Sequence, residues 1–281
     1  MKIPFEKKRR LTGYIFTAPF IIGFGLLMLV PLIMTLIMSF GEIYDIVGLK
    51  TRFIGFEHYI KLFKEDVTFI PAFLNTIKIS FLWTPFIVVF ALFIAILLNK
   101  DIKGKSIFRV IFFLPVLLGS GYIMLQLDGA TNILKMPTAM EEFIAYYFNP
   151  SIADFINQLL AQIMNVFWKT GVQILLFLSG LQSIPDSYYE AARVDNANSW
   201  ECFWKITLPM ISPIVLLNVV YTMIDSFRDT NNEIGALIVN VGFDNANYEY
   251  GSAMGWVFFA VIGLFTGLVF LISRRLVVYD K

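Results

Sequence analysis

Four ionisable residues interrupt or border the most apolar parts of this chain, where charges are otherwise rare. Lys169 lies inside one long apolar run, and Asp225, Arg228 and Asp229 lie at the end of another. Asp225 stands three residues before Arg228 and four before Asp229, so a helix would carry all three on one face. Such groups can form a structural salt-bridge network or, with a polar neighbour such as Gln173, hydrogen-bond a polar solute. The sequence leaves both roles open.

No motif for catalysis, nucleotide binding or metal binding accompanies these residues. The sequence contains no Walker-type phosphate loop, no GxGxxG or GxSxG motif and no Cys/His cluster with metal-ligand spacing. His58 is the only histidine, and Cys202 is the only cysteine, so an internal disulfide is impossible. We therefore expect no enzyme activity, no metal, no cofactor bound by this chain and no nucleic-acid partner.

The composition is that of a membrane protein. Hydrophobic residues make up 58% of the chain and charged residues 15%, against about 25% charge in a typical soluble domain. A membrane-spanning helix needs about 20 mostly apolar residues, and six runs reach roughly that length. We predict an all-α membrane protein with a single transmembrane domain over residues 1–281 and six helices, at approximately 14–40, 72–98, 108–127, 157–183, 210–230 and 251–273.

The charges between the six predicted helices indicate the orientation. Lys and Arg number 14 in the segments on the same side as the termini, but only 5 in the loops on the opposite side. Cytoplasmic loops of membrane proteins carry such an excess of basic residues. We therefore predict that both termini are cytoplasmic, and that the basic N-terminus lies close to lipid headgroups.

A polar segment, residues 184–209, separates the fourth and fifth predicted spans and has the pattern of two helices joined by a turn. Ser183 is a candidate cap for the first helix, and Ser199 is a candidate cap for the second. Between them, Asn196 is suited to a left-handed helix end, a conformation that Asn tolerates better than most residues. The second helix should present an apolar face formed by Trp200, Phe203, Trp204 and Leu208.

This segment resembles the cytoplasmic loop of permeases in binding-protein-dependent ABC importers, which reads Glu-Ala-Ala, three residues, Gly, nine residues, Ile-x-Leu-Pro. The matching residues are Glu190, Ala191, Ala192, Asp195, Ile206, Leu208 and Pro209. Asn196 replaces the glycine. Segments outside the loop, among them Asn75-Thr76 and Phe112–Pro115, are similar to carbohydrate-uptake permeases of the maltose and glycerol-phosphate type.

The resemblance implies the fold and the partners of a type I ABC importer permease. It implies a sugar or oligosaccharide permease of a bacterial-type cell membrane, which pairs with a second permease subunit, two ATPase subunits that bind ATP-Mg, and an extracytoplasmic solute-binding protein. Loop 184–209 would dock on the ATPase. The small Ala191 and Ala192 would let the first helix seat closely in a groove of the ATPase, and Glu190 would supply a charge for a basic contact.

Two alternative functions stay open. The cargo could be a phosphodiester or an amino acid rather than a sugar, because the sequence names neither the solute nor its size. An ion-driven secondary transporter would instead predict inverted repeats and helices broken at mid-membrane, for which the hydropathy gives no sign. The sequence also does not say whether the permease pair is a heterodimer or a homodimer.

The orientation can be tested at Cys202. This thiol lies in the loop that the charge bias assigns to the cytoplasm, so a membrane-impermeant thiol reagent should modify it in inside-out vesicles and not in intact cells. A cysteine introduced into the loop 41–70 serves as the external control and should react in intact cells. Labelling of Cys202 in intact cells would reverse the predicted topology.

Overall fold

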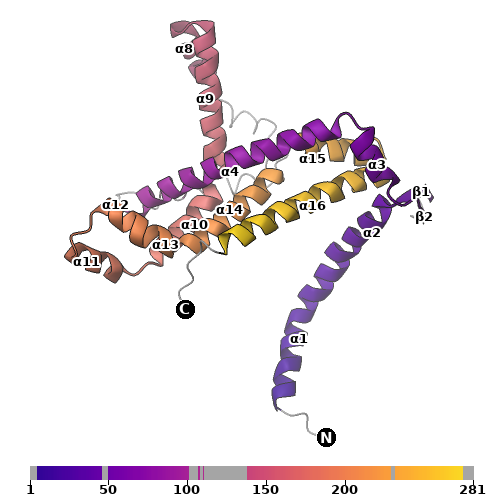
Figure 1. Cartoon of the computed structure of the whole chain (residues 1–281), viewed down its shortest axis with the longest axis horizontal. Coiled ribbons are helices and arrows are strands. Elements are labelled where there is room, and N and C mark those ends of the chain that lie inside the picture. The colour runs from indigo at the N-terminus through magenta and orange to yellow at the C-terminus, as the bar shows by residue number, and fades with distance from the viewer. Residues whose placement is uncertain are drawn as a thin grey trace. The chain divides into compact units, whose positions relative to one another are not determined.

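The computed structural model describes residues 5–45, 50–100, 107, 110, 138–228 and 232–274. Over these residues the chain is almost entirely helical (Figure 1). It forms two compact units, one from Met1–Ile77 with Phe227–Leu264, the other from Lys78–Ser226 with Phe265–Lys281. The helices α4 and α16 each contribute to both units.

The first unit contains, in the described residues, a hairpin, all or part of six α-helices and two π-helical segments. In chain order its elements are α1 (Phe5–Phe24), η1 (Gly25–Leu29), α2 (Val30–Ser39), β1 (Gly41–Asp45), β2 (Lys50–Phe53), α3 (Glu57–Lys64), the start of α4 (Phe69–Asn99), α15 (Glu233–Val239), η3 (Asn240–Asp244) and most of α16 (Tyr248–Ser273). The two strands pair antiparallel, with Gly41 opposite Phe53.

The second unit contains the rest of α4 and the loop that the sequence singles out. Its further elements are α8 (Thr138–Tyr147), α9 (Pro150–Lys169), α10 (Gly171–Gln182), α11 (Asp186–Val194), α12 (Ser199–Cys202), η2 (Phe203–Thr207), α13 (Leu208–Met210) and α14 (Ser212–Phe227). In Figure 1, α10, α14 and the second half of α4 run side by side, and the loop helices follow at one end.

Three described helices are long and apolar enough to cross a membrane. They are Thr12–Ser39, Phe69–Asn99 and Tyr248–Ser273, which confirms the helices predicted at 14–40, 72–98 and 251–273. The predicted helix 210–230 corresponds to α14, which is bent by 68° from the helical segment Ser199–Met210 before it. The described residues thus hold three candidate spans, or four if the bent pair counts as one.

One predicted helix was wrong, and another is not described. Residues 157–183 do not form one helix, because the chain changes direction between α9 and α10 (Figure 1). Thr170, with φ of −92° and ψ of −3°, lies between the two helices, and Gly171, a poor helix former, follows it. The predicted helix 108–127 lies outside the described residues, except for residue 110.

Small residues allow the helices of the second unit to pack closely. Its buried core joins Val88, Ala91, Ala95 and Leu98 of α4 to Ile174, Phe177, Leu178 and Leu181 of α10 and to Ile184 and Ile211. Ala91 and Ala95 are one helical turn apart and fully buried. Gly180 faces α14, where a Cβ atom would lie 2.9 Å from Cγ1 of Ile214. Such small residues at contacts are typical of membrane helices, which gain by close backbone approach.

The first unit is held at one end by a capped helix start. The Asp66 carboxylate accepts hydrogen bonds from the Thr68 and Phe69 amides (2.9 and 3.0 Å), from the Thr68 hydroxyl (2.7 Å) and from the Tyr250 hydroxyl (2.8 Å). Burial alone raises the pKa of Asp66, but these hydrogen bonds stabilise the carboxylate and hold the pKa below its ordinary value. The start of α4 is thereby tied to α16.

A close backbone contact also joins α16 to η3. A Cβ atom on Gly251 would lie 2.7 Å from the Cα atom of Gly242, so any side chain at this position would force the two segments apart. On the same helix, Gly263 faces open space, with nothing within 4 Å of a built Cβ. The two glycines therefore offer a matched pair for testing this contact.

We predict that Gly251→Ala lowers the melting temperature of the purified protein, whereas Gly263→Ala leaves it unchanged or raises it. The added methyl group meets backbone atoms, and overpacking of this kind costs about 1–3 kcal/mol. At Gly263 the same methyl group meets nothing, and alanine favours the helix. Thermal unfolding in detergent compares the two variants. Equal melting temperatures would show that the contact between Gly251 and Gly242 is absent in the protein.

Candidate functional site

The first arm of the loop, α11, starts differently from the prediction. Helix α11 begins at Asp186, its N-cap position is Pro185, and no side chain caps it. Ser183 is therefore not the cap. Its hydroxyl donates to the Gly180 carbonyl (2.7 Å), because Ser183 still has helical backbone angles at the end of α10. Asp186 lies in the first turn of α11, where an acidic side chain is favourable near the helix dipole.

The turn at the end of α11 confirms the prediction for Asn196. Asn196 has a φ of +56°, in the left-handed region. Its amide donates to the Arg193 carbonyl (3.1 Å), and the amide of Ala197 donates to the Ala192 carbonyl (2.9 Å). These two bonds are those of a Schellman motif, which satisfies the last carbonyls of a helix. Asn196 thus performs the conformational role of the glycine it replaces.

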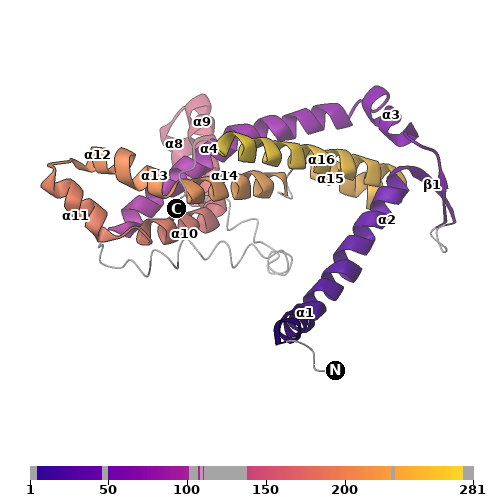
Figure 2. The ribbon, with the colours of Figure 1, turned by 60° about the horizontal axis from the view of Figure 1, so that its bottom comes forward.

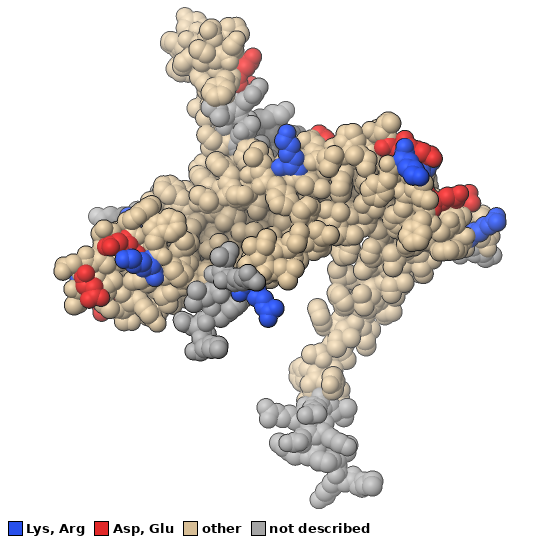
Figure 3. Space-filling view, viewed as in Figure 1, with Lys and Arg blue, Asp and Glu red and all other residues tan. Residues whose placement is uncertain are grey.

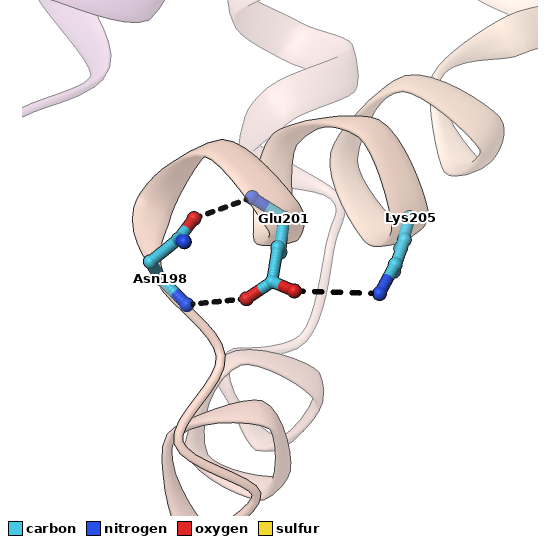
Figure 4. Close-up of polar contacts among 3 residues, drawn as sticks. All are labelled: Asn198, Glu201 and Lys205. Carbon is cyan, nitrogen blue, oxygen red and sulfur yellow. Dashed lines mark hydrogen bonds and ion pairs between the residues drawn. The ribbon is translucent and has the colours of Figure 1, made fainter.

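The second arm is capped by Asn198 and not, as predicted, by Ser199. The Asn198 side chain accepts from the Glu201 amide (2.9 Å), and the Glu201 carboxylate accepts from the Asn198 amide (3.0 Å), a capping box (Figure 4). Lys205 lies 3.5 Å from the same carboxylate. The hydrogen bond from the Asn198 amide, followed by the charge of Lys205, lowers the pKa of Glu201. Asn198, and not Ser199, is the cap because its side chain reaches the amide of Glu201, the third residue of the helix.

One hydrogen bond joins the two arms of the loop. The Tyr189 hydroxyl lies 2.9 Å from Oγ1 of Thr207, which also donates to the Cys202 carbonyl (3.3 Å). Tyr189 packs against the core of the second unit, so the link fastens the loop to α4, α10 and α14. Figure 2 shows α11 and α12 as two arms folded back on each other. This pair was not predicted from the sequence, since 18 residues separate Tyr189 from Thr207.

The two arms differ in which of the predicted docking residues they expose. Glu190, Ala191 and, at the turn, Asp195 and Asn196 are exposed. Ala192 is half-buried and falls on the same helical face as Tyr189. In the second arm, the residues that match the loop pattern of the permeases are also half-buried. They are Ile206, Leu208 and Pro209. The structure thus separates the predicted residues into an exposed group and a group that lies against the chain's own helices.

The apolar face predicted for the second arm also has exposed residues and residues that lie against the chain's own helices. The side chains of Trp200 and Trp204 are 69% and 49% exposed, and Val194 at the end of α11 is 82% exposed. Phe203 instead lines a groove of about 310 Å³, together with Cys202 and α4 residues such as Ile96. Large exposed apolar side chains beside charged ones are typical of a surface that a partner covers. Figure 3 shows charged side chains gathering over α11 and α12 and over α3, with the long helices nearly free of them.

A second candidate site is a row of buried polar side chains, here called the polar seam. It comprises Ser80 and Thr84 of α4, Gln173 of α10, and Asn218, Thr222 and Ser226 of α14, all buried except Ser226, which is half-buried. Gln173 Nε2 donates to Thr222 Oγ1 (3.1 Å), and the Ser226 hydroxyl donates to that of Ser80 (2.9 Å). The sequence analysis found Gln173 alone. The spacing of four residues along α14 and α4 could have identified the rest.

The polar seam contains two buried acceptors that lack a hydrogen-bond partner among the described residues. They are Oε1 of Gln173 and Oδ1 of Asn218, on side chains that are 1% and 0% exposed. An unpaired buried polar atom costs about 1–3 kcal/mol, so these positions favour a guest that donates hydrogen bonds. Water or a hydroxyl-bearing solute would satisfy both atoms.

The four predicted charged residues occupy different environments. Lys169 is half-buried in the last turn of α9, and Asp225 is half-buried on α14. Arg228 is exposed, and Asp229 lies outside the described residues. The predicted network of Asp225, Arg228 and Asp229 therefore stays a prediction. No group of three or more His, Cys, Asp or Glu side chains that could hold a metal ion occurs among the described residues.

The sequence matches the family model described as "Binding-protein-dependent transport system inner membrane component" over residues 68–279. This range begins just before α4 and includes the loop and α16. It therefore contains both candidate sites, the exposed arm of the loop and the polar seam.

The chain also resembles individual relatives over most of its length. The probable ABC transporter permease protein YesP of Bacillus subtilis (strain 168) is 33% identical, with 98% of this chain and 94% of the relative covered. The arabinooligosaccharides transport system permease protein AraP of the same strain is 30% identical, with 90% and 86% covered. A chain from the crystal structure of a bacterial ABC transporter involved in the import of the acidic polysaccharide alginate has a TM-score of 0.67 at 21% identity, covering 96% of this chain and 97% of its own length. At 21% identity, this similarity shows only that the two chains share a fold.

The turn at Asn196 yields a prediction that needs no knowledge of the partners. Asn196→Gly should leave the loop intact, and Asn196→Val should loosen it, because a β-branched residue is strongly disfavoured at positive φ. Trypsin cleaves after Arg193, so the rate of cleavage at Arg193–Val194 reports the opening of the turn. Asp195→Val is the matched control, since Asp195 has an ordinary φ of −80°. Equal cleavage rates in the two valine variants would contradict the role of Asn196.

Proposed function

The chain belongs to the family of binding-protein-dependent transport system inner membrane components, and we propose that it is the permease subunit of an ATP-driven importer for a sugar or oligosaccharide. As a member of this family it is a membrane-integral transport subunit and not an enzyme. The whole chain, residues 1–281, would act as one permease domain with six spans, both termini in the cytoplasm, in a bacterial cytoplasmic membrane.

The observation that carries the proposed coupling is the geometry of α11. This helix presents Glu190 and Ala191 on its exposed surface. The turn at Asn196 closes its C-terminal end, and the bond between Tyr189 and Thr207 holds it near its middle. A small exposed alanine lets a partner surface approach the helix closely, and the neighbouring carboxylate suits a basic contact. Because Tyr189 also packs into the core of α4, α10 and α14, a push on α11 would be transmitted to these helices.

This docking surface would meet an ATPase subunit. In the proposed assembly, this chain pairs with a second permease, two ATPases bind ATP-Mg below the membrane, and an extracytoplasmic protein delivers the solute. The alginate transporter has also been crystallised in complex with a periplasmic protein bound to an alginate pentasaccharide, which supports an assembly of this kind. The chain itself would bind no cofactor.

The polar seam is the proposed contact with the solute. Sugars carry many hydroxyl donors, and these could bond to Oε1 of Gln173 and Oδ1 of Asn218, which lack a partner among the described residues. The charged residues Lys169, Asp225, Arg228 and Asp229 are further candidates for the solute path. The alternative for the charged residues is a structural network that keeps α14 in place, since buried ion pairs are often structural.

The names of two similar proteins support a sugar as the cargo. One is named for arabinooligosaccharides and the other for alginate. A phosphodiester or an amino acid is the alternative cargo within the same family. An ion-driven transporter is a poorer fit, because the docking surface of α11 would have no partner.

One experiment tests both the cargo and the coupling. The chain is expressed with its second permease, ATPase and binding protein, and uptake is measured for labelled oligosaccharides, amino acids and glycerophosphodiesters. We expect saturable uptake of an oligosaccharide and its near-complete loss, together with loss of ATPase co-purification, in Ala191→Trp, because the indole would hold the partner away from α11. Glu190→Ala should weaken co-purification less.

Ala145→Trp is the matched control, because Ala145 is also exposed on a helix, α8, outside the loop. It should insert, co-purify with the ATPase and support uptake as the wild type does. We do not choose Ala192 for the test, since it is half-buried and a large side chain there would disturb the chain's own packing. Normal uptake and co-purification in Ala191→Trp would refute the docking surface, and uptake of amino acids alone would refute the sugar.

A further inference from the structure

The second unit contains a groove that brings two basic side chains together. The groove has a volume of about 310 Å³ and lies between the end of α4 and the two arms of the loop. Lys100 lines it from just after α4, and Arg193 lines it from α11. No Asp or Glu of the described residues lines the groove. Two positive charges from distant parts of the sequence therefore meet at one concave site.

Neither positive charge is neutralised within the described part of the chain. Lys100 and Arg193 form no ion pair with another residue that the structure describes. Glu201, the acidic residue of the second arm, instead lies 3.5 Å from Lys205. In the sequence, residues 101–109 contain three basic residues and one acidic residue, so the segment after Lys100 also carries a net positive charge. Like charges in one groove repel each other, and a bound anion relieves this repulsion.

The hydrogen-bond donors of the groove suit a phosphate group. The Arg193 guanidinium is a planar fork of N–H donors that matches two phosphate oxygens, and Lys100 adds a compact positive charge. The Ser199 hydroxyl also lines the groove and makes no hydrogen bond to another described residue. A phosphate monoester has three strong acceptor oxygens, whereas a carboxylate has only two. A phosphate monoester can therefore bond to all three side chains at once.

The groove lies at the boundary of the membrane. Lys100 directly follows α4, which is the candidate span Phe69–Asn99. Lipid headgroups lie at this level, and basic residues beside a span are attracted to anionic ones. The groove also has apolar lining residues, among them Ile96 and Phe203, which would contact the glycerol part of a lipid. Both a lipid phosphate and a soluble phosphate can reach this position.

The groove and the proposed docking surface occupy different sides of α11. Tyr189 and Arg193 stand four residues apart and both line the groove, so they share one face of the helix. Successive residues of an α-helix are rotated by about 100°, which places Ala191 on the opposite side. A ligand in the groove would therefore leave Glu190 and Ala191 accessible, and it would join α11 to the end of α4.

We propose that this groove binds a phosphate monoester group, which Arg193 and Lys100 hold between α11 and the end of α4. At neutral pH such a group carries a charge of about −1.5 to −2, which balances the two basic side chains. Its source is either the headgroup of phosphatidic acid in the membrane or a soluble phosphate. The site does not depend on the proposed cargo, and its test measures binding without transport or ATP hydrolysis.

The test titrates the assembled importer in detergent with phosphatidic acid, phosphatidylglycerol and phosphatidylcholine of the same acyl chains, and native mass spectrometry measures the bound lipid. We expect phosphatidic acid to bind most tightly. Its dissociation constant should rise about fivefold in Arg193→Gln and in Lys100→Gln, because each variant loses one basic contact with the phosphate. Arg193→Lys, which keeps the charge and loses the fork, should give a smaller rise.

Equilibrium dialysis with radiolabelled inorganic phosphate tests the soluble source on the same variants. Tight binding of phosphatidic acid without binding of inorganic phosphate would assign the site to the lipid headgroup. Binding of inorganic phosphate that both glutamine variants weaken would assign it to a soluble phosphate.

Lys205→Gln is the matched control, because it removes the same charge from the same loop and Lys205 does not line the groove. It should bind both probes as the wild type does. An equal loss in Lys205→Gln and Arg193→Gln would show attraction by the overall charge of the loop and overturn the site. Unchanged binding in both groove variants would also overturn it, as would a wild type that neither prefers phosphatidic acid nor binds inorganic phosphate.

Discussion

The hydrogen bond between the hydroxyl groups of Tyr189 and Thr207 is the contact on which the candidate function of this chain depends. It closes the loop into two arms, and the Tyr189 ring carries that closure into the core formed by α4 and α10. Without it, the two arms would be joined only by the turn between them, and α11 would be held to the helices only by the packing of Tyr189. The Schellman turn at Asn196 and the capping box at Asn198 add local rigidity, but neither reaches the helices of the second unit.

Prolines determine where this rigid loop meets the membrane helices. Pro209 and Pro213 flank Ile211 and lack the N–H groups that would continue a helix through this point. The chain accordingly bends by 68° between Met210 and Ser212. The second arm therefore runs in a different direction from α14.

The two units differ in whether the polar groups among their apolar helices have hydrogen-bond partners. In the first unit, the Asp66 carboxylate accepts four hydrogen bonds at the start of α4, from Thr68, Phe69 and Tyr250. In the second unit, two acceptors of the polar seam, on Gln173 and Asn218, have no hydrogen-bond partner among the residues that the structure describes. Unpaired buried acceptors reduce stability and are retained where a guest or an alternative conformation uses them. The proposed contact with the solute therefore lies in the second unit.

The sequence by itself determined the membrane class, three of the helices and the conformation of Asn196, because these depend on local properties: apolar length, residue spacing and the φ that a side chain tolerates. It could not locate the break at Thr170, since the run 157–183 is apolar on both sides of it. It also could not separate Ala191 from Ala192, pair Tyr189 with Thr207, or assemble the polar seam from three helices. Those features depend on which residues distant in sequence become neighbours, and only the packing of the helices against one another decides that.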